Sequence, residues 1–392
     1  MKRLLLFVTL SYSIVCCTPA SMDQIEYIDY KVLDWEAADF SSFKRFDPAV
    51  ADFENLLFFL DKKLTFRVAA ISYPTVDPNG ESVWASGLVY HPINQKSKGV
   101  IDFMPMARLH SDRGASEDLF VIEGLLALLG YTLIVPDLIG SGTTKDKMTP
   151  FLMAENTGRV AYDMRRAAAQ YLWDHFRYAL PIETTIMGYS LGGFAALAAQ
   201  KYYETHHSNT VRVKEVRAGG GPYDLEVAFA TYAQSGISEY PAIPHTIIAF
   251  DHYYELKLDF AQIFTGILLE NDNYQTWFHG QYGVEELRDL LGDNLHAYMH
   301  ADFFKPFDQQ NAEFKRLLPF LKENSVSEGW RPKAPIYLSN AKNDAFVPAA
   351  CAEAAVRKLR RAGANILLHQ YSGDHVTVGV LYYLRSIIHF FL

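Results

Sequence analysis

Short apolar runs alternate with longer helix-forming segments along most of the chain. The runs are rich in Val, Ile and Leu, and the segments between them have helical periodicity. This alternation predicts an α/β fold in which helices cover both faces of a mostly parallel, doubly wound sheet. The predicted strands are residues 99–105, 132–137, 183–187, 213–220, 334–340 and 366–372, and the main predicted helices are residues 115–129, 155–179, 190–203, 349–362 and 376–391.

A hairpin is predicted before the first parallel strand. Two β-rich runs within residues 65–91 flank Asp77-Pro78-Asn79-Gly80. The Asn-Gly pair is a strong signal for a tight turn, because both residues tolerate a positive φ. We therefore expect the sheet to begin with an antiparallel N-terminal hairpin.

Residues 223–330 interrupt the alternation. They contain several helix-like segments separated by prolines, many aromatic side chains and no convincing strand. The alternation resumes after them, so they are expected to be an insertion and not a second domain in series. We predict a helical cap inserted into a single core made of residues 65–222 and 331–392.

The first residues resemble an export signal. Lys2 and Arg3 precede an apolar run from Leu4 to Val15. This run is shorter than the roughly 20 residues that a membrane-spanning helix needs, and it has the layout of a secretory signal. We therefore predict a signal peptide at residues 1–16.

Two adjacent cysteines, Cys16 and Cys17, follow this run. A cysteine in this position resembles the lipidated residue of bacterial lipoproteins. The sequence thus predicts membrane attachment through Cys16 or Cys17 in a periplasmic or cell-surface lipoprotein, with plain secretion as the alternative. Residues 17–64 form an aromatic-rich leader, in which helical spacing of apolar residues from Asp47 to Lys63 predicts a docking helix.

The composition excludes several classes of protein. Of the 392 residues, 49% are hydrophobic and 21% are charged, which is typical of a globular chain and not of a disordered one. The formal net charge of −9 is spread along the chain and argues against a nucleic-acid partner. Cys351 is the one cysteine in the body of the chain, so a disulfide framework there is excluded and the thiol is expected in a helix of the core. Nothing in the composition indicates an oligomeric state.

The sequence contains no recognised motif for a metal or cofactor. It has no H-E-x-x-H or C-x-x-C spacing, no phosphate loop of the G-x-x-x-x-G-K type and no dinucleotide fingerprint. We therefore expect neither a metal nor a cofactor.

The most informative motif is the segment GYSLGG, which runs from Gly188 to Gly193. It follows the predicted strand 183–187 and opens an alanine-rich helix. In a G-x-S-x-G motif, the glycines permit a sharp strand–turn–helix reversal that leaves the serine hydroxyl exposed. The motif predicts a nucleophile elbow in which Ser190 is the nucleophile and Gly188, Tyr189 and Gly192 shape the turn.

A serine nucleophile needs a general base, which in turn is held by a carboxylate. Asp344 follows the predicted strand 334–340, and His375 follows the predicted strand 366–372. The chain order Ser190, Asp344, His375 is the order found in α/β-hydrolases. These three residues are the predicted catalytic triad.

Two aspartates leave an alternative open for the acid. Asp344 could instead cap the helix that begins near Ala349. Asp374 is adjacent to His375 in the sequence, but adjacent side chains diverge, which makes Asp374 the weaker partner.

Other polar residues are given different roles. His206 and His207 follow a helix and are expected in solvent. His110 follows the strand at 99–105 and is expected in a surface loop, with lining of the site as the alternative. Asp137 ends a predicted strand and is expected to be a structural cap, with a role as the catalytic acid as the alternative.

The oxyanion needs two N–H donors near the serine. The first is expected from the backbone of Leu191, at the N-terminus of the helix that follows Ser190. The second is expected from the loop after the strand at 99–105, where Pro105 has no N–H to donate. Met106 is therefore the predicted second donor.

Together these motifs resemble the α/β-hydrolase superfamily and, within it, the secretory lipase family in its bacterial lipoprotein branch. The chain departs from the family pattern in two places: the oxyanion loop lacks His-Gly, and Ser339-Asn340-Ala341 replaces the commoner histidine-glycine before the acid. The resemblance is carried by VDPNGESVWASGLVYHP (76–92), GYTLIVPDLIGSG (130–142), GYSLGG (188–193), GGGPYDL (219–225), WRPKAPIYLSNAKNDAFVP (330–348) and SGDH (372–375).

The resemblance implies serine ester hydrolysis under a helical lid, in agreement with the predicted cap. The expected function is that of an exported ester hydrolase of the lipase or carboxylesterase type. It would act through an acyl-enzyme on a small-molecule ester, either an acyl ester or an acylated sugar. A serine peptidase with the same triad and a non-catalytic glycan- or lipid-binding protein are the alternatives.

Overall fold

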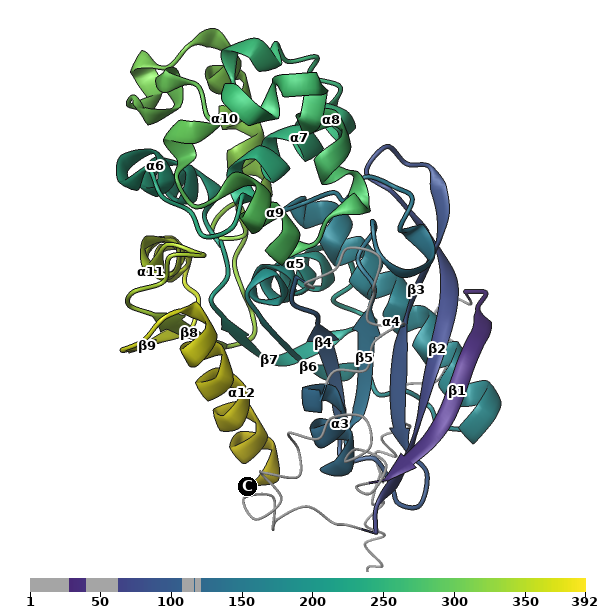
Figure 1. Cartoon of the computed structure of the whole chain (residues 1–392). Helices are drawn as coiled ribbons and strands as arrows, with labels where there is room; N and C mark the ends of the chain where they lie inside the picture. Colours follow the sequence, from purple (N-terminus) through teal and green to yellow (C-terminus); the bar gives the residue numbers. More distant parts are fainter. Residues whose placement is uncertain (1–27, 40–62, 108–115, 117–120) are drawn as a thin grey trace, which may run out of the picture.

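A nine-stranded sheet forms the centre of the protein, with the strand order β1-β2-β3-β5-β4-β6-β7-β8-β9 (Figure 1). The computed structural model describes residues 28–39, 63–107, 116 and 121–392. The pairs from β1 to β5 are antiparallel, and the pairs from β5 to β9 are parallel. This mostly parallel sheet confirms the predicted α/β fold.

The antiparallel end of the sheet contains the predicted hairpin and one further strand. Strands β2 (Thr65–Val76) and β3 (Ser82–Pro92) pair along their length, and Gly80 has a φ of 81° in the turn between them. Strand β1 (Lys31–Asp39) pairs with β2 at the edge of the sheet. Strand β1 was not predicted from the sequence, because its side chains are mostly exposed and lack an apolar alternation.

The parallel strands lie at the runs expected for them. Strands β4 and β5 are buried along their whole length, as expected for strands covered on both faces. The strands are β4 (Val100–Met104), β5 (Thr132–Pro136), β6 (Glu183–Tyr189), β7 (Arg212–Gly219), β8 (Ile336–Ala341) and β9 (Ile366–Tyr371).

Helices cover both faces of this sheet. On one face, α3 (Val121–Leu128) and α12 (His375–Phe391) contact each other and share a buried cluster with strand residues. On the other face lie α4 (Ala154–Phe176), α5 (Leu191–His206) and α11 (Ala349–Arg361). The predicted helix at 115–129 is described only from residue 121 onward.

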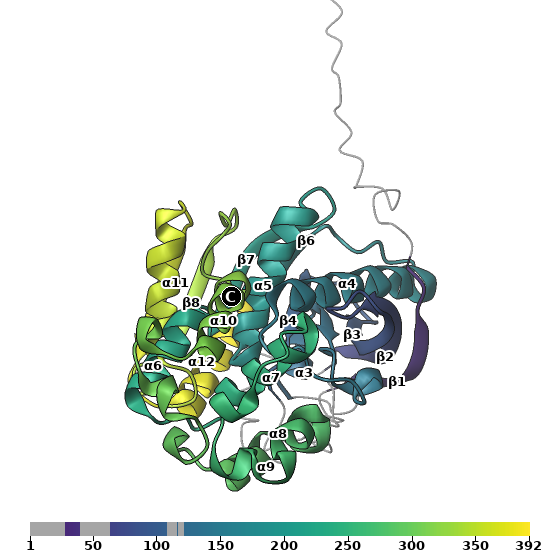
Figure 2. The same ribbon diagram turned by 90° about the horizontal axis from the view of Figure 1, so that it is seen from above.

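Residues 223–330, which we call the cap, contribute no strand to the sheet. They follow β7 and precede β8, which are neighbours in the sheet, and they lie together at one end of it (Figures 1 and 2). Short 3₁₀ turns, one π-helical turn and two isolated bridges join the cap helices. These helices are α6 (Leu225–Ser235), α7 (Ala242–Tyr254), α8 (Asn273–Thr276), α9 (Val284–Leu291) and α10 (Ala312–Asn324).

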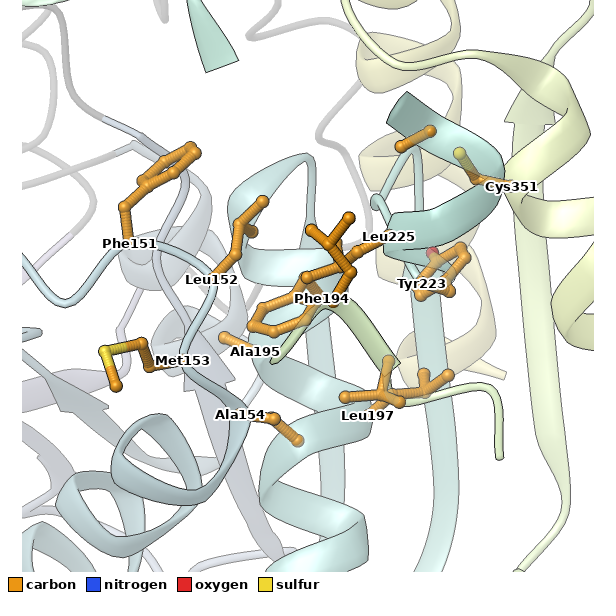
Figure 3. Packing of buried hydrophobic residues seen from close by; sticks show 14 of the residues in the cluster. Phe151, Leu152, Met153, Ala154, Phe194, Ala195, Leu197, Tyr223, Leu225 and Cys351 are labelled. Atoms are coloured by element: carbon orange, nitrogen blue, oxygen red, sulfur yellow. The ribbon is translucent and has the colours of Figure 1, made fainter. Parts of the chain in front are cut away.

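The cap and the sheet share one cluster of buried side chains. Figure 3 shows Phe194 and Leu197 of α5 in this cluster. They lie together with Leu152, with Leu225, which belongs to the cap, and with Cys351 of α11. The same apolar contacts therefore hold both the helix that follows Ser190 and the first helix of the cap.

Several predictions concern residues outside the described ranges. They are the signal peptide at 1–16, Cys16 and Cys17, the docking helix at 47–63, and His110. Among the described helices, none is both long enough and apolar enough to cross a membrane.

Candidate active site

Ser190 lies in the turn between β6 and α5. Its φ of 59° and ψ of −125° are a strained conformation for a residue with a side chain. Its N–H donates to Gly219 O at 2.8 Å, and its carbonyl accepts from Gly193 N at 2.9 Å. A Cβ at Gly188 would lie 2.2 Å from Gly192 O, so close backbone contact demands glycine there. The segment thus has the strand–turn–helix geometry expected of a nucleophile elbow.

The three residues of the predicted triad lie in one hydrogen-bonded row. His375 Nε2 is 2.9 Å from Ser190 Oγ, and His375 Nδ1 is 2.7 Å from Asp344 Oδ2. The side chain of Asp344 is fully buried, and that of His375 is 9% exposed. A proton on Nδ1 is held by the carboxylate, which leaves the Nε2 lone pair to accept the serine proton.

The second carboxylate oxygen of Asp344 is held by the backbone. Asp344 Oδ1 accepts from Phe346 N at 3.0 Å and from Val347 N at 2.8 Å. The N-cap of α11 is Pro348, so the alternative role of Asp344 as the cap of that helix is excluded. These bonds orient the carboxylate toward His375.

Asp374 has a different task from Asp344. It is the N-cap of α12, and its carboxylate accepts from Thr377 N at 2.8 Å. This backbone N–H lowers the pKa of the Asp374 carboxyl. Asp374 therefore secures the first turn of the helix that begins with His375.

The histidines at the end of α5 are not part of the row. His206 is exposed, as expected, and its Nε2 lies 3.6 Å from Glu155 Oε1. The prediction for His207 is wrong: it stacks on Tyr162, with ring centroids 3.6 Å apart. Partial burial lowers the pKa of His207 to about 4. Helical periodicity could not reveal this contact, because Tyr162 belongs to α4.

Two tyrosines connect α12 to the elbow. Tyr189 donates its hydroxyl to His375 O at 2.7 Å, and its ring centroid lies 5.1 Å from the imidazole. Tyr382 accepts from Gly188 N at 3.0 Å and donates to Arg217 O at 2.7 Å. Burial raises the pKa of both phenols, so both remain protonated donors. Tyr382 was not predicted from the sequence, since it lies within an apolar helix and no local signal marks it.

A pocket of about 350 Å³ lies beside Ser190 and His375. Most of its wall is apolar and comes from the cap, from residues near 151 and from the first turns of α12. The wall also carries a carboxylate, that of Glu285, and a guanidinium, that of Arg288, both from α9. Examples of the apolar wall residues are Phe151, Leu152, Phe229, Ile243, Val284 and Val376.

Phe346 links the pocket wall to the imidazole. Its ring stacks on His375, with centroids 5.1 Å apart and an interplanar angle of 22°. The guanidinium of Arg288 lies 5.0 Å from the centroid of the same Phe346 ring. The stack covers one side of the imidazole with apolar surface. Neither Phe346 nor Arg288 was predicted from the sequence.

The two predicted oxyanion donors both line this pocket. Leu191 is the first residue of α5, directly after Ser190. Met106 follows Pro105 beyond the end of β4. Their positions are compatible with N–H groups near the serine, and their roles as donors remain predictions.

Asp137 and Cys351 have structural surroundings. Asp137 is buried and accepts from the hydroxyls of Ser86 and Ser116 and from Ser116 N at 3.1 Å. This set of partners agrees with the structural role predicted for it. Cys351 is a free, buried cysteine in α11, and burial raises the pKa of its thiol, which disfavours the reactive thiolate.

In the part of the chain that the structure describes, no group of three or more His, Cys, Asp or Glu side chains is arranged to hold a metal ion.

The fold is similar to that of several solved structures. One is from Legionella pneumophila (TM-score 0.79, 21% identity, 93% of this chain and 97% of that chain). A second is the rice cell wall degrading esterase LipA from Xanthomonas oryzae (TM-score 0.74, 21% identity, 93% and 96% of the chains). A third is Candida antarctica lipase A in its closed state (TM-score 0.59, 16% identity, 92% and 82%).

These similarities establish the fold as that of the α/β-hydrolases. No protein-family model and no curated protein sequence matches the chain.

Proposed function

We propose that this chain is an exported serine ester hydrolase of the lipase or carboxylesterase type. The observation that carries the proposal is the hydrogen-bonded row Asp344–His375–Ser190 beside an apolar pocket. The strained backbone of Ser190 supports it, because such strain is common at functional sites. An esterase and a lipase among the similar structures point the same way.

In the proposed reaction, Ser190 Oγ attacks the ester carbonyl carbon while His375 Nε2 takes the hydroxyl proton. The carbonyl electron pair moves to oxygen, where the N–H groups of Leu191 and Met106 stabilise the negative charge. The intermediate then expels the alcohol, which receives the proton from His375, and the acyl group stays on Ser190. Water attacks this acyl-enzyme with His375 again as base, and the acid leaves.

Asp344 is proposed to act through His375. It keeps the proton on Nδ1 and stabilises the imidazolium that forms in each half of the reaction. Its three hydrogen bonds leave it little freedom to turn away from the ring. The geometry therefore favours one tautomer of His375 before substrate arrives.

The pocket indicates which part of the ester it binds. Its apolar wall suits an acyl chain or an aromatic acid and offers few partners for a polar group. We propose that residues 223–330 form a lid over a core made of residues 65–222 and 331–392, so the cap side chains contact that part of the ester. We further propose that the chain belongs to the bacterial lipoprotein branch of the secretory lipases.

Export and lipid attachment are proposed from the N-terminal sequence alone. The mature protein would either lack residues 1–16 and carry a lipid on Cys17, or begin at Cys16 and carry the lipid there. Mass spectrometry of the protein isolated from membranes tests this proposal. An intact N-terminal Met, or a mature end without lipid in a secreted protein, would contradict the attachment.

The activity is tested with Ser190→Ala and a fluorophosphonate probe. The wild-type protein should hydrolyse p-nitrophenyl esters and become labelled, and the variant should do neither while keeping its thermal unfolding midpoint. Esters of increasing chain length, beside acetylated and feruloylated sugars, identify the acid and alcohol that fit. Ester turnover by the variant, or release of an amine from short peptides with no ester turnover, would overturn the proposal.

A further inference from the structure

A second cavity, of about 500 Å³, lies between α12 and strands β7, β8 and β9. We call it the cationic groove and define it by Arg217, Tyr337, His369, Tyr371, Arg385 and His389. It has no lining residue in common with the pocket beside Ser190. The groove is thus a separate feature that the proposed ester hydrolysis does not use.

The register of the parallel strands creates the groove. Arg217 of β7 lies opposite Tyr337 of β8, and Ala341 of β8 lies opposite Tyr371 of β9. Residues two apart on a strand share a face, so the groove residues of the three strands face α12 together. Arg385 and His389, one helical turn apart on α12, complete the wall.

The groove has an excess of positive charge. The residues that line it include two arginines and two histidines and no aspartate or glutamate. Glu215, next to the groove, is shared: its Oε1 lies 2.9 Å from Arg217 Nε and 2.9 Å from His389 Nε2. One carboxylate therefore serves a guanidinium and an imidazole, in a chain whose overall charge is −9.

Arg385 is the second arginine of the groove. In the part of the chain that the structure describes, its guanidinium has no carboxylate partner and lies 5.4 Å from the centroid of the Tyr371 ring. The guanidinium of Arg217 lies similarly over Tyr337, at 5.0 Å. Contact with an aromatic ring restrains a guanidinium without using its N–H donors. Both guanidinium groups are thus held beside the cavity and keep N–H donors that can bind a ligand.

We propose that the cationic groove binds a phosphate group, carried either by a free phosphate ester or by the headgroup of an anionic lipid. The two guanidinium groups stand on different walls, Arg217 on β7 and Arg385 on α12, and so face an oxyanion from two sides. A tetrahedral phosphate can accept from both guanidinium groups, whereas a planar carboxylate is satisfied by one of them. Ser339 on the strand floor adds a hydroxyl donor.

Titration with inorganic phosphate tests the site. Isothermal calorimetry at constant ionic strength should show saturable binding to the wild-type protein. Arg385→Gln should raise the Kd by about tenfold or more, as expected for the loss of a charged donor. Arg361→Gln, at an exposed arginine in the last turn of α11, is the matched control and should leave the Kd unchanged.

Arg385 is exposed, so its replacement should leave the unfolding midpoint unchanged, whereas Arg217 also holds Glu215. Ser190→Ala should bind phosphate as the wild type does, which separates this site from the proposed activity. Absence of saturable binding, or an equal effect of Arg385→Gln and Arg361→Gln, would overturn the proposal.

Vesicles distinguish the two sources of phosphate. Leu384 and Ile388 of α12 are 45% and 51% exposed beside Arg385, so acyl chains could contact them if the phosphate belongs to a bilayer. Cosedimentation with phosphatidylcholine vesicles that contain phosphatidylglycerol, and not with phosphatidylcholine alone, would assign a lipid headgroup. Binding of glycerol phosphate without cosedimentation would assign a free ester. Vesicle binding that Arg385→Gln leaves intact would count against the groove.

Discussion

Replacing Asp344 by asparagine should reverse the tautomer of His375. Asp344 Oδ1 accepts from the N–H groups of Phe346 and Val347, so the amide oxygen of the asparagine must take that place. The amide NH₂ then faces His375 Nδ1, which is able only to accept from it. The imidazole proton therefore moves to Nε2, and the lone pair that would take the proton of Ser190 is lost.

The expected loss in kcat is about 10³- to 10⁴-fold, or ~4–5.5 kcal/mol of transition-state stabilisation at about 1.4 kcal/mol per tenfold. KM should change little, because the wall of the pocket beside Ser190 stays as it is. Stability should also change little, since the amide oxygen keeps both backbone hydrogen bonds.

The assay is steady-state release of p-nitrophenol, with circular dichroism to check the fold. Asp374→Asn is the matched control: it makes the same change in the acid next to His375, at an N-cap where Asn serves as well as Asp. The reasoning is refuted if Asp344→Asn keeps kcat within about tenfold of the wild type. It is refuted equally if Asp374→Asn loses as much activity.

Three further substitutions test the surroundings of the site. Tyr382→Phe removes the acceptor of Gly188 N and should cost about 1–3 kcal/mol in urea unfolding; an unchanged midpoint would argue against this brace. Gly188→Ala should lower the free energy of unfolding by about 3 kcal/mol or more and remove activity, because the new Cβ would lie 2.2 Å from Gly192 O. Gly99→Ala is the control and should be tolerated, because its Cβ would lie 3.4 Å from the nearest atom of the Tyr131 ring. Burial lowers the pKa of His245 to about 3, so below about pH 6.5 the unfolded chain binds a proton that the folded chain does not. From about pH 7 to about pH 5, the free energy of unfolding of the wild type should therefore fall by about 2 kcal/mol more than that of His245→Phe. Equal losses in the two proteins would refute the shift in pKa.

Much of the fold follows from local pattern. The runs at β4 and β5 are continuously apolar because both faces of these strands are buried, and such runs can be recognised without knowing their neighbours. The turn at Gly80 is local in the same sense, since its positive φ and the residues that tolerate it are adjacent in the sequence. By contrast, β1 exists through its pairing with β2, and its own side chains carry no period-two signal.

The candidate site is local only in part. Ser190 is marked by its own flanking glycines. Asp344 and His375 could be selected because parallel strands end at one edge of the sheet, which turns positions far apart in the chain into neighbours. Whether Asp344 or Asp374 meets the ring was open in the sequence. The loop bonds to Asp344 Oδ1 and the capping bond to Asp374 decide it.

Local patterns in the chain were enough to predict the order of the strands from β2 onward, the position of the cap between two strands, and the residues proposed for the triad. The contacts of Tyr382 with the elbow, the stack of His207 on Tyr162 and the cationic groove arise from tertiary packing. Periodicity reports which face of an element is buried, whereas these contacts depend on strand register and on how helices pack. Gly188 and Tyr382, which share a hydrogen bond, are 194 positions apart in the chain.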